Sequence, residues 1–350
     1  MPLYPDLLAA SPLSIDQAMR TAIAAAERVR GTTTPNPPVG CVILDATGLP
    51  VAVAATDPVG GPHAEAQAVA EAGERARGGV AVVTLEPCHH HGRTPPCTGS
   101  LLESGVREIA FAVADPNPVA AGGADWLDAR DVKVTGGVLG DEVADGVLRP
   151  WLHWQATRRP HITLKTAGTL DGLAAATDGS SQWITGEAAR ARVHVDRSRR
   201  DAVIVGTGTV LADDPRLTAR NLEGEPLDRQ PLRIAVGRKE IPADANIRGD
   251  GAVGGFRHIQ PRDMAQVVDV LADLGVIDVL VEGGPRLAGA FLEAGLVDAV
   301  EAYVAPGLLG AGTATVDTDG STTIDDIRRF RTIGVELLGD DVLIRAVARG

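Results

Sequence analysis

Two short motifs constrain the first half of the chain more than any other feature. They are HAE at residues 63–65 and EPCHHHGRTPPC at residues 86–97. A catalytic zinc ion is held by three nitrogen or sulfur ligands and keeps an open fourth position, whereas a structural zinc ion has four protein ligands. The motifs supply one imidazole, two thiols and a spare carboxylate, Glu65, which can serve as a proton shuttle. We therefore predict one zinc ion per chain, with the ligands His63, Cys88 and Cys97.

The expected secondary structure places these residues at the ends of elements. Cys88 directly follows a buried strand, and His63 and Cys97 each open a helix, where the helix dipole favours a thiolate. HAE alone is most often a surface helix start, and two Pro-Cys pairs alone can be buried thiols. In this order and context they predict a zinc deaminase. Around them we expect helices at 14–30, 63–77 and 95–104, and strands at 39–44, 51–54, 80–85 and 108–113.

The second half of the chain repeats an alternation of strands and helices. With 350 residues the chain has room for two α/β domains, which we place at 1–150 and 151–350, joined by a packed connector with two tryptophans. The glycines of Gly206–Gly208 lack the third glycine of a dinucleotide fingerprint, so we reject a Rossmann domain. Gly283–Gly284 lies between a strand and a helix, where backbone amides can bind a pyrophosphate; a tight turn is the equally probable alternative in isolation.

The net charge and the cysteine content limit the classes of partner and the compartment that we expect. A net charge of −13 disfavours nucleic acid or an anionic membrane as the main partner, because both require basic patches. Three cysteines give no disulfide framework and fit a reducing compartment. The N-terminal segment lacks the pattern of a signal peptide, and no apolar run reaches membrane-spanning length. We expect a cytoplasmic protein, a homo-oligomer, that acts on small-molecule nucleotides.

The motifs resemble those of the bifunctional riboflavin-biosynthesis deaminase–reductase family. TTPNPPVGCV, HAE and EPCHHHGRTPPC resemble its deaminase half, including the eight residues between the two cysteines. LKTAGTLDG, DGSSQWIT, VGTGTVLADDPRLTAR and VEGGP resemble its reductase half. The resemblance implies an α/β chain with an N-terminal cytidine-deaminase-like three-layer domain and a C-terminal dihydrofolate-reductase-like domain. One departure is Gln67, where many relatives have a second histidine.

The resemblance also implies two consecutive reactions. The first domain would deaminate 2,5-diamino-6-(5-phosphoribosylamino)pyrimidin-4-one by hydrolysis, and the second would reduce the ribosyl group of the product to ribityl with NADPH. In the deaminase the resemblance assigns substrate contacts to Asn36, His90 and Arg93. Lys165 or Glu282 would handle a proton during reduction, a choice that stays open.

For the reductase site the resemblance implies two sets of residues. The NADPH site would be lined by Ala167, Trp183, Thr209, Asp213, Gly284, Pro285, Arg286, Leu287, Ala288, Gly289 and Ala290. The substrate would be surrounded by Lys165, Ser181, Thr185, Arg197, Leu217, Arg220 and Glu282. Among these, the two arginines can hold a phosphate through bidentate hydrogen bonds. Arg238 and Lys239 are further candidates, for the 2′-phosphate of NADPH.

Three alternatives compete with this interpretation. Only one half of the chain could be active, with the other as a scaffold. A polynucleotide-editing deaminase is disfavoured by the negative charge and by an aromatic content of 3%, because single-strand binders use basic grooves and stacking rings. A zinc-stabilised interaction module would have no use for Glu65 beside the metal. Tightly bound NADPH would distinguish the deaminase–reductase from the last two.

Overall fold

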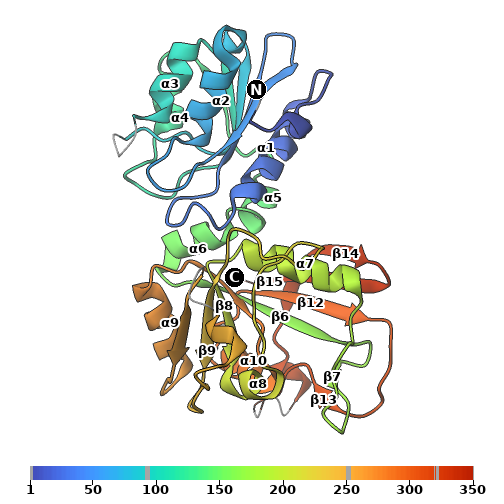
Figure 1. Cartoon of the computed structure of the whole chain (residues 1–350). Helices are drawn as coiled ribbons and strands as arrows, with labels where there is room; N and C mark the ends of the chain where they lie inside the picture. The colour runs from blue at the N-terminus through green and yellow to red at the C-terminus, as the bar shows by residue number, and fades with distance from the viewer. Residues whose placement is uncertain (1–2, 91–94, 250–253, 319, 321–322, 350) are drawn as a thin grey trace. The chain divides into compact units, whose positions relative to one another are not determined.

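A computed structural model describes residues 3–90, 95–249, 254–318, 320 and 323–349 (Figure 1). The chain divides into two compact units, Met1–Arg158 and Arg159–Gly350. The division that we expected after residue 150 falls inside helix α6 (Arg149–Thr157), eight residues before the observed one. The reason is Trp151, which is 5% exposed and packs into the core of the first unit. No helix among the described residues is long and apolar enough to cross a membrane.

The first unit is built on a five-stranded sheet in the order β2-β1-β3-β4-β5. Strand β1 is antiparallel to β2 and β3, whereas β3, β4 and β5 are parallel. The strands are β1 (Gly40–Leu44), β2 (Pro50–Ala55), β3 (Val80–Leu85), β4 (Glu108–Val113) and β5 (Lys133–Thr135). The remaining elements are η1 (Pro5–Leu7), α1 (Ile15–Val29), α2 (Ala64–Ala72), η2 (Gly73–Ala76), α3 (Cys97–Ser104), α4 (Gly123–Asp128), α5 (Gly140–Asp145) and α6.

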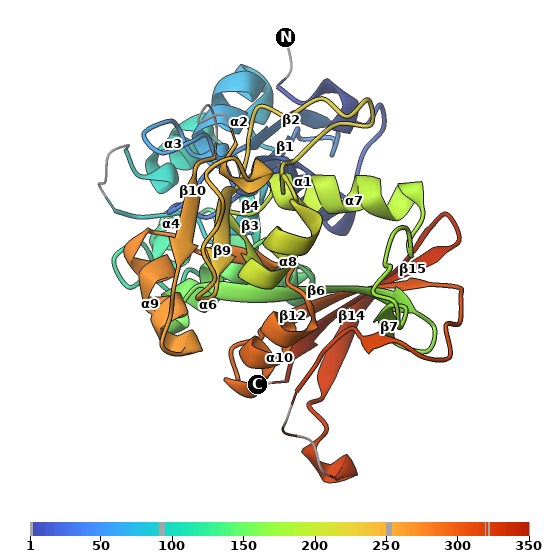
Figure 2. The ribbon, with the colours of Figure 1, turned by 60° about the horizontal axis from the view of Figure 1, so that its bottom comes forward.

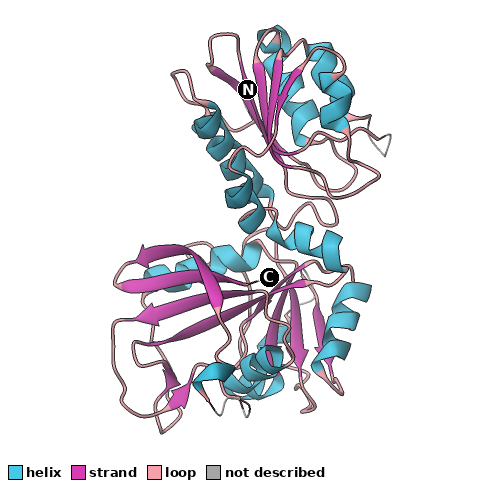
Figure 3. Cartoon of the chain, turned by 180° about the vertical axis from the view of Figure 1, so that it is seen from behind, coloured by secondary structure: helices cyan, strands magenta, loops and turns pink. Residues whose placement is uncertain are grey.

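Helices cover both faces of this sheet. Figures 1 and 3 show α2, α3 and α4 on one side and α1 and α5 on the other. All residues of β1, β2 and β3 are buried, as expected for strands between two helical layers. Helix α1 has the predicted capping box between Ser14 and Gln17. It lies so close to β1 that a Cβ atom on Gly40 would come within 1.9 Å of the Ala22 carbonyl oxygen.

The second unit contains an eight-stranded sheet in the order β10-β9-β8-β11-β6-β12-β15-β14 (Figure 2). Its pairs are parallel from β10 to β12, and β15 and β14 are added antiparallel. The strands are β6 (His161–Thr169), β8 (Ala202–Gly206), β9 (Leu232–Val236), β10 (Phe256–Ile259), β11 (Asp278–Val281), β12 (Ala299–Ala305), β14 (Phe330–Leu338) and β15 (Asp341–Ala348). A separate two-stranded sheet pairs β7 (Leu173–Ala175) with β13 (Thr313–Ala314).

Alternate residues of the central strands face different helices. On one face, Ile204 belongs to the core formed with α9 (Met264–Asp273) and α10 (Pro285–Glu293). On the other face, Val203 and Val205 pack with Val210 of α8 (Thr207–Asp213), and α7 (Glu187–Ser198) packs against Tyr303 and Leu343. Two 3₁₀ helices complete the unit, η3 (Asn246–Arg248) and η4 (Ile324–Asp326).

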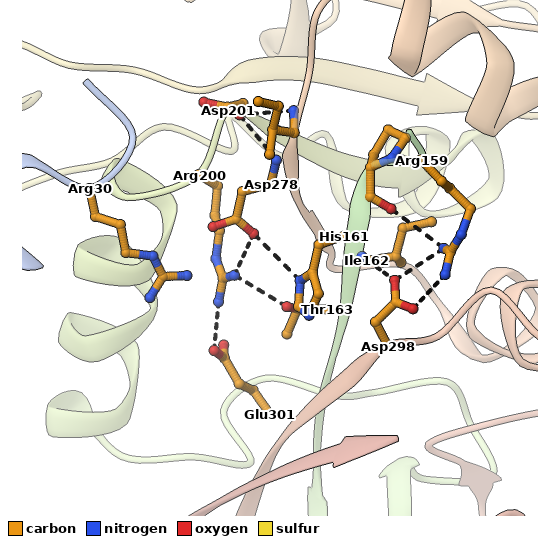
Figure 4. A network of polar contacts seen from close by, with 12 residues as sticks. Arg30, Arg159, His161, Ile162, Thr163, Arg200, Asp201, Asp278, Asp298 and Glu301 are labelled. Atoms are coloured by element: carbon orange, nitrogen blue, oxygen red, sulfur yellow. Dashed lines mark hydrogen bonds and ion pairs between the residues drawn. The ribbon is translucent and has the colours of Figure 1, made fainter. Parts of the chain in front are cut away.

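A buried arginine joins three neighbouring strands of this sheet (Figure 4). Arg200, 3% exposed, donates to Thr163 of β6 at 3.2 Å, to Asp278 of β11 at 2.8 Å and to Glu301 of β12 at 2.6 Å. The same view shows Arg159 paired with Asp298, whose carboxylate also accepts the Ile162 N–H at 2.8 Å. Because buried charges are costly without partners, Arg200 holds these strands together by neutralising two carboxylates.

Replacing Arg200 with methionine should destabilise the second unit by about 3–5 kcal/mol, because two buried carboxylates would lose their shared cation. The matched control is Arg286→Met. That side chain is 94% exposed and lies 3.8 Å from Asp317, so its loss should change stability by less than about 1 kcal/mol. Calorimetric unfolding of the two variants measures the difference. Equal stabilities would show that Arg200 does not hold the strands together.

Candidate active sites

Three segments bring the predicted zinc ligands together in the first unit. His63 is the residue before α2, Cys88 lies three residues after β3, and Cys97 is the first residue of α3. Their ligand atoms lie within 4.8 Å of one another. The Nδ1 atom of His63 is 3.6 Å from the sulfur of Cys88 and 3.3 Å from that of Cys97. Tetrahedral zinc with ordinary Zn–N and Zn–S bonds places nitrogen and sulfur about 3.6 Å apart, so the set fits the metal.

The electrostatics of the trio also suit a cation. Hydrogen bonding from Cys97, together with His63, lowers the pKa of the Cys88 thiol to about 4, against the opposing effect of burial. The thiolate that binds a metal is therefore the favoured form of Cys88. The third cysteine, Cys41, is fully buried within β1, and burial raises its pKa well above the usual value. Cys41 lies outside the ligand cluster, as expected from its strand pattern.

Glu65 lies beside the ligands and is 4% exposed. Burial, reinforced by the negative charge of Cys88, raises the pKa of its carboxyl group to about 7. Two residues further along α2, the Gln67 side-chain amide donates to the carbonyl oxygens of Ala55 at 2.6 Å and Pro62 at 3.2 Å. The residue that departs from the family pattern thus ties the segment leading to His63 onto the end of β2.

A cavity of about 190 Å³ opens onto His63, Glu65 and Cys88. Two of the residues expected to contact the substrate, Asn36 and His90, line it, and His90 Nδ1 has no partner among the described residues. The third, Arg93, lies outside the described residues. Sequence reasoning missed several other lining residues, among them Glu86, Asp115 and Asn117. For Asp115 and Asn117 the signal was available, because a DPNP stretch begins two residues after the end of the parallel strand β4.

The second unit contains a cavity of about 890 Å³ at the carboxyl ends of β6, β8 and β11. A cavity of this size suits a dinucleotide together with a substrate. Every residue expected at the substrate lines it, and these residues are Lys165, Ser181, Thr185, Arg197, Leu217, Arg220 and Glu282. Of the expected cofactor residues, those that line it are Ala167, Trp183, Thr209, Asp213, Gly284 and Pro285.

The rest of the expected cofactor segment follows the course of α10. Leu287 and Ala288 are buried in the core, and a Cβ atom on Gly289 would come within 1.7 Å of the Asp317 carbonyl oxygen. Arg286 is exposed and pairs with Asp317. These residues and Ala290 are not among those that line the cavity. Arg238 and Lys239 are exposed after β9, and their role stays a prediction.

Buried charges cluster at the centre of the large cavity. Arg197 donates through Nε to Glu282 at 2.6 Å, through Nη2 to Glu282 at 2.8 Å and through Nη1 to the Thr218 carbonyl oxygen at 3.1 Å. Burial would raise the pKa of Glu282, but Arg197 and Lys165 outweigh it and hold that pKa below its usual value. Burial lowers the pKa of Lys165, while Glu282 opposes that shift.

Several residues of this cavity had not been expected from the sequence, among them His194 and Thr218. The ring of His194 contacts the Thr218 carbonyl oxygen through Nδ1 at 2.9 Å, and Arg220 donates to the Thr218 hydroxyl at 2.9 Å. Thr218 thereby contacts three basic side chains of the cavity, those of His194, Arg197 and Arg220. No sequence spacing links residues 194 and 218, since the contact depends on how α7 packs beside the chain after α8.

Comparisons with known proteins cover nearly the whole chain. Residues 13–113 match the family described as the cytidine and deoxycytidylate deaminase zinc-binding region, and residues 160–344 match the RibD C-terminal domain. The riboflavin biosynthesis protein RibD of Mycobacterium tuberculosis is 49% identical over 96% of this chain and 98% of its own. RibD of Escherichia coli is 36% identical over 94% of this chain and 98% of its own.

Solved structures of similar proteins match this chain over the same length as these relatives do. Acinetobacter baumannii RibD (form 1) is 35% identical, covers 96% of this chain and 99% of its own, and has a TM-score of 0.83. A Thermotoga maritima structure, described as a diaminohydroxyphosphoribosylaminopyrimidine deaminase/5-amino-6-(5-phosphoribosylamino)uracil reductase, is 31% identical. It covers 96% of this chain and 99% of its own, with a TM-score of 0.84.

The expected fold classes are confirmed, with a cytidine-deaminase-like domain followed by a dihydrofolate-reductase-like domain. The zinc-binding family match and the His63, Cys88 and Cys97 cluster agree on the metal. Since the relatives match over almost their entire lengths, both halves of the family are present. The chain belongs to the RibD family of bifunctional riboflavin-biosynthesis enzymes, which combine a zinc-dependent deaminase with an NADPH-dependent reductase.

Proposed function

We propose specific roles for the residues of the two sites. The first domain acts on 2,5-diamino-6-(5-phosphoribosylamino)pyrimidin-4-one and releases ammonia, and the second reduces the ribosyl group of the resulting 5-amino-6-(5-phosphoribosylamino)uracil. The observation that best supports this division is that each of the two described cavities is lined by most of one of the two residue sets. The test is to incubate the purified chain with the diaminopyrimidine nucleotide, with and without NADPH, and resolve the products by mass.

In the deaminase, His63, Cys88 and Cys97 hold zinc, and Glu65 moves the proton. Zinc, when bound, polarises water and lowers its pKa. Glu65 accepts a proton from the water whose oxygen forms the new C–O bond, and returns it to the amino nitrogen as the C–N bond breaks. Burial raises the pKa of this carboxyl group toward the range in which a group can both take and give a proton. Asn36, His90 and Arg93 contact the nucleotide, and the open cavity beside the ligands supports this for the first two.

In the reductase, Lys165 is the better candidate for the proton donor. NADPH supplies the hydride when bound. Glu282 is paired with Arg197, which keeps it ionised and unable to donate a proton. Lys165 is buried in the same cavity and carries a transferable proton. Arg197 then orients Glu282. Arg220 lines the cavity and contacts the Thr218 hydroxyl group, not a carboxylate, so we assign the substrate phosphate to Arg220.

The cofactor assignment rests on the turn before α10. Gly284 caps this helix in an extended conformation, and a Cβ atom there would lie 2.9 Å from the Thr209 hydroxyl oxygen. The bare backbone at a helix N-terminus is suited to a pyrophosphate. We place the NADPH pyrophosphate there, with Trp183, Thr209 and Asp213 along the cofactor. The chain acts in the cytoplasm as a homo-oligomer, a proposal that for the compartment rests on its three free cysteines.

The metal assignment is tested by elemental analysis. Cys88→Ser and Cys97→Ser should each lose most of the bound zinc, because each removes one of three protein ligands. Cys41→Ser should keep it, since Cys41 is buried inside β1 and away from the cluster. Full zinc content in both motif variants would refute the ligand set.

The proton shuttle is tested by Glu65→Gln, which keeps the size of the side chain. This variant should retain zinc but release ammonia about a hundredfold or more slowly, because an essential acid–base group is lost. Reduction of supplied 5-amino-6-(5-phosphoribosylamino)uracil should continue at the wild-type rate. Normal deamination by Glu65→Gln would exclude the role.

Two variants separate the halves of the reductase site. Arg220→Ala should raise the KM for the nucleotide about tenfold or more and leave the Kd for NADPH unchanged, because a charge-assisted contact is lost. Gly284→Val should weaken NADPH binding, since the new side chain occupies the turn and crowds Thr209. NADPH titration by fluorescence, paired with substrate kinetics, measures both effects. The reverse pattern would mean that the two halves of the site have been exchanged.

A further inference from the structure

Glu86 has an unusual set of partners for a residue beside a metal site. It follows β3 directly, lies two residues before the ligand Cys88 and is 7% exposed. One carboxylate oxygen accepts the N–H of Asp115 at 3.1 Å. The other accepts the N–H groups of Gly122 at 3.1 Å and Ala124 at 3.0 Å. Both oxygens are therefore engaged by backbone donors, and Glu86 is not available as an acid or base.

Asp115 and Gly122 are the two ends of one loop, residues 115–122, which runs from the end of β4 to the start of α4, and Ala124 lies in the first turn of α4. The loop contributes Asp115, Asn117 and Ala120 to the wall of the deaminase cavity. It is also ordered internally, since the Asp115 carboxylate accepts the Asn117 N–H at 2.8 Å. Backbone hydrogen bonds to a carboxylate are charge-assisted and directional, so Glu86 fixes where this wall stands.

A close backbone contact also joins the start of α4 to the segment between Glu86 and Cys88. A Cβ atom on Gly123 would come within 1.8 Å of the Pro87 carbonyl oxygen, so α4 begins directly against the chain between Glu86 and Cys88. Beyond Cys88, the His89 N–H donates to the Ala120 carbonyl oxygen at 3.1 Å. The 115–122 loop is thus attached to the metal-ligand segment on both sides of Cys88.

We propose that Glu86 is a positioning residue for deamination, which sets the distance between the zinc ligands and the cavity wall that receives the substrate. The proposal rests on the deaminase function given above. Through the 115–122 loop, Glu86 governs how well the nucleotide binds, while Glu65 governs the proton transfer. Loss of the Glu86 charge should therefore change the KM more than kcat.

The test is Glu86→Gln in the full-length zinc-loaded chain. The glutamine carbonyl oxygen can still accept from Gly122 and Ala124, but its amide nitrogen cannot accept the Asp115 N–H. The KM of deamination should rise about tenfold, the size expected for one lost charge-assisted hydrogen bond, and kcat should change less than about twofold. Zinc content should stay at the wild-type level. Hydrogen exchange should become faster at residues 115–124.

Asp45→Asn is the matched control within the same domain. The Asp45 carboxylate also accepts backbone N–H groups, from Thr47 at 2.8 Å and Leu49 at 3.0 Å, but at the β1–β2 turn, away from both cavities. It should leave the KM unchanged. Gly123→Ala disturbs the junction with Glu86 intact, so it should raise the KM in the same way as Glu86→Gln.

The outcomes separate this inference from the deaminase function itself. If the wild-type chain releases no ammonia from the diaminopyrimidine nucleotide, the function has failed. If the wild type is active and Glu86→Gln has an unchanged KM, or loses zinc or kcat instead, the positioning role is overturned. Calorimetric unfolding of each preparation reports whether the deaminase domain, which carries the substitution, is folded. Should Glu86→Gln not fold, an unchanged KM in Gly123→Ala overturns the proposal by itself.

Discussion

Both sites depend on where parallel strands end. Strand β3 leads directly into Glu86–Cys88, and β11 leads directly into Glu282–Gly284. Parallel strands with helical crossovers bring their carboxyl ends to one edge of the sheet, where side chains from distant segments can meet. The antiparallel strand β1 brings a further segment to that edge, because Cys41 at its start pairs with Val83 near the end of β3. The Asn36 loop therefore reaches the zinc ligands.

The second domain uses the two ends of the same strands for different purposes. Asp278 begins β11 and is neutralised by Arg200, while Glu282 follows the other end and is paired with Arg197. On β6, Thr163 contacts Arg200, and Lys165, two residues later on the same face, enters the cavity. A structural charge cluster thus holds the strands that carry Lys165 and Glu282 to the cavity, so the geometry of the cavity depends on a network that lies outside it.

The sequence predicted those parts of the molecule that depend on local signals. The capping box of α1 and the buried strand β3 appear where expected, and His63, Cys88 and Cys97, which were chosen for their places next to element ends, lie together. Contacts between distant segments could not be predicted in this way. The Arg197–Glu282 pair joins residues 85 positions apart, and nothing in their spacing indicates it. Strand β14 was missed although Ile333, Val335 and Leu337 alternate along it, and all three of these apolar side chains are exposed.

Three buried glutamates show that partners, more than burial, decide what a carboxylate can do. Glu282 meets a guanidinium, which keeps it charged and makes it an electrostatic anchor for Lys165. Glu65 is equally buried but lacks such an ion pair, so desolvation prevails and its pKa rises to about 7, where a proton can be both taken and given. Within the part of the chain that the structure describes, the Glu86 carboxylate accepts backbone N–H groups, which bind it without supplying a transferable charge. Both of its oxygens accept hydrogen bonds from the backbone at the ends of the 115–122 loop, so we assign Glu86 to positioning this wall of the deaminase cavity.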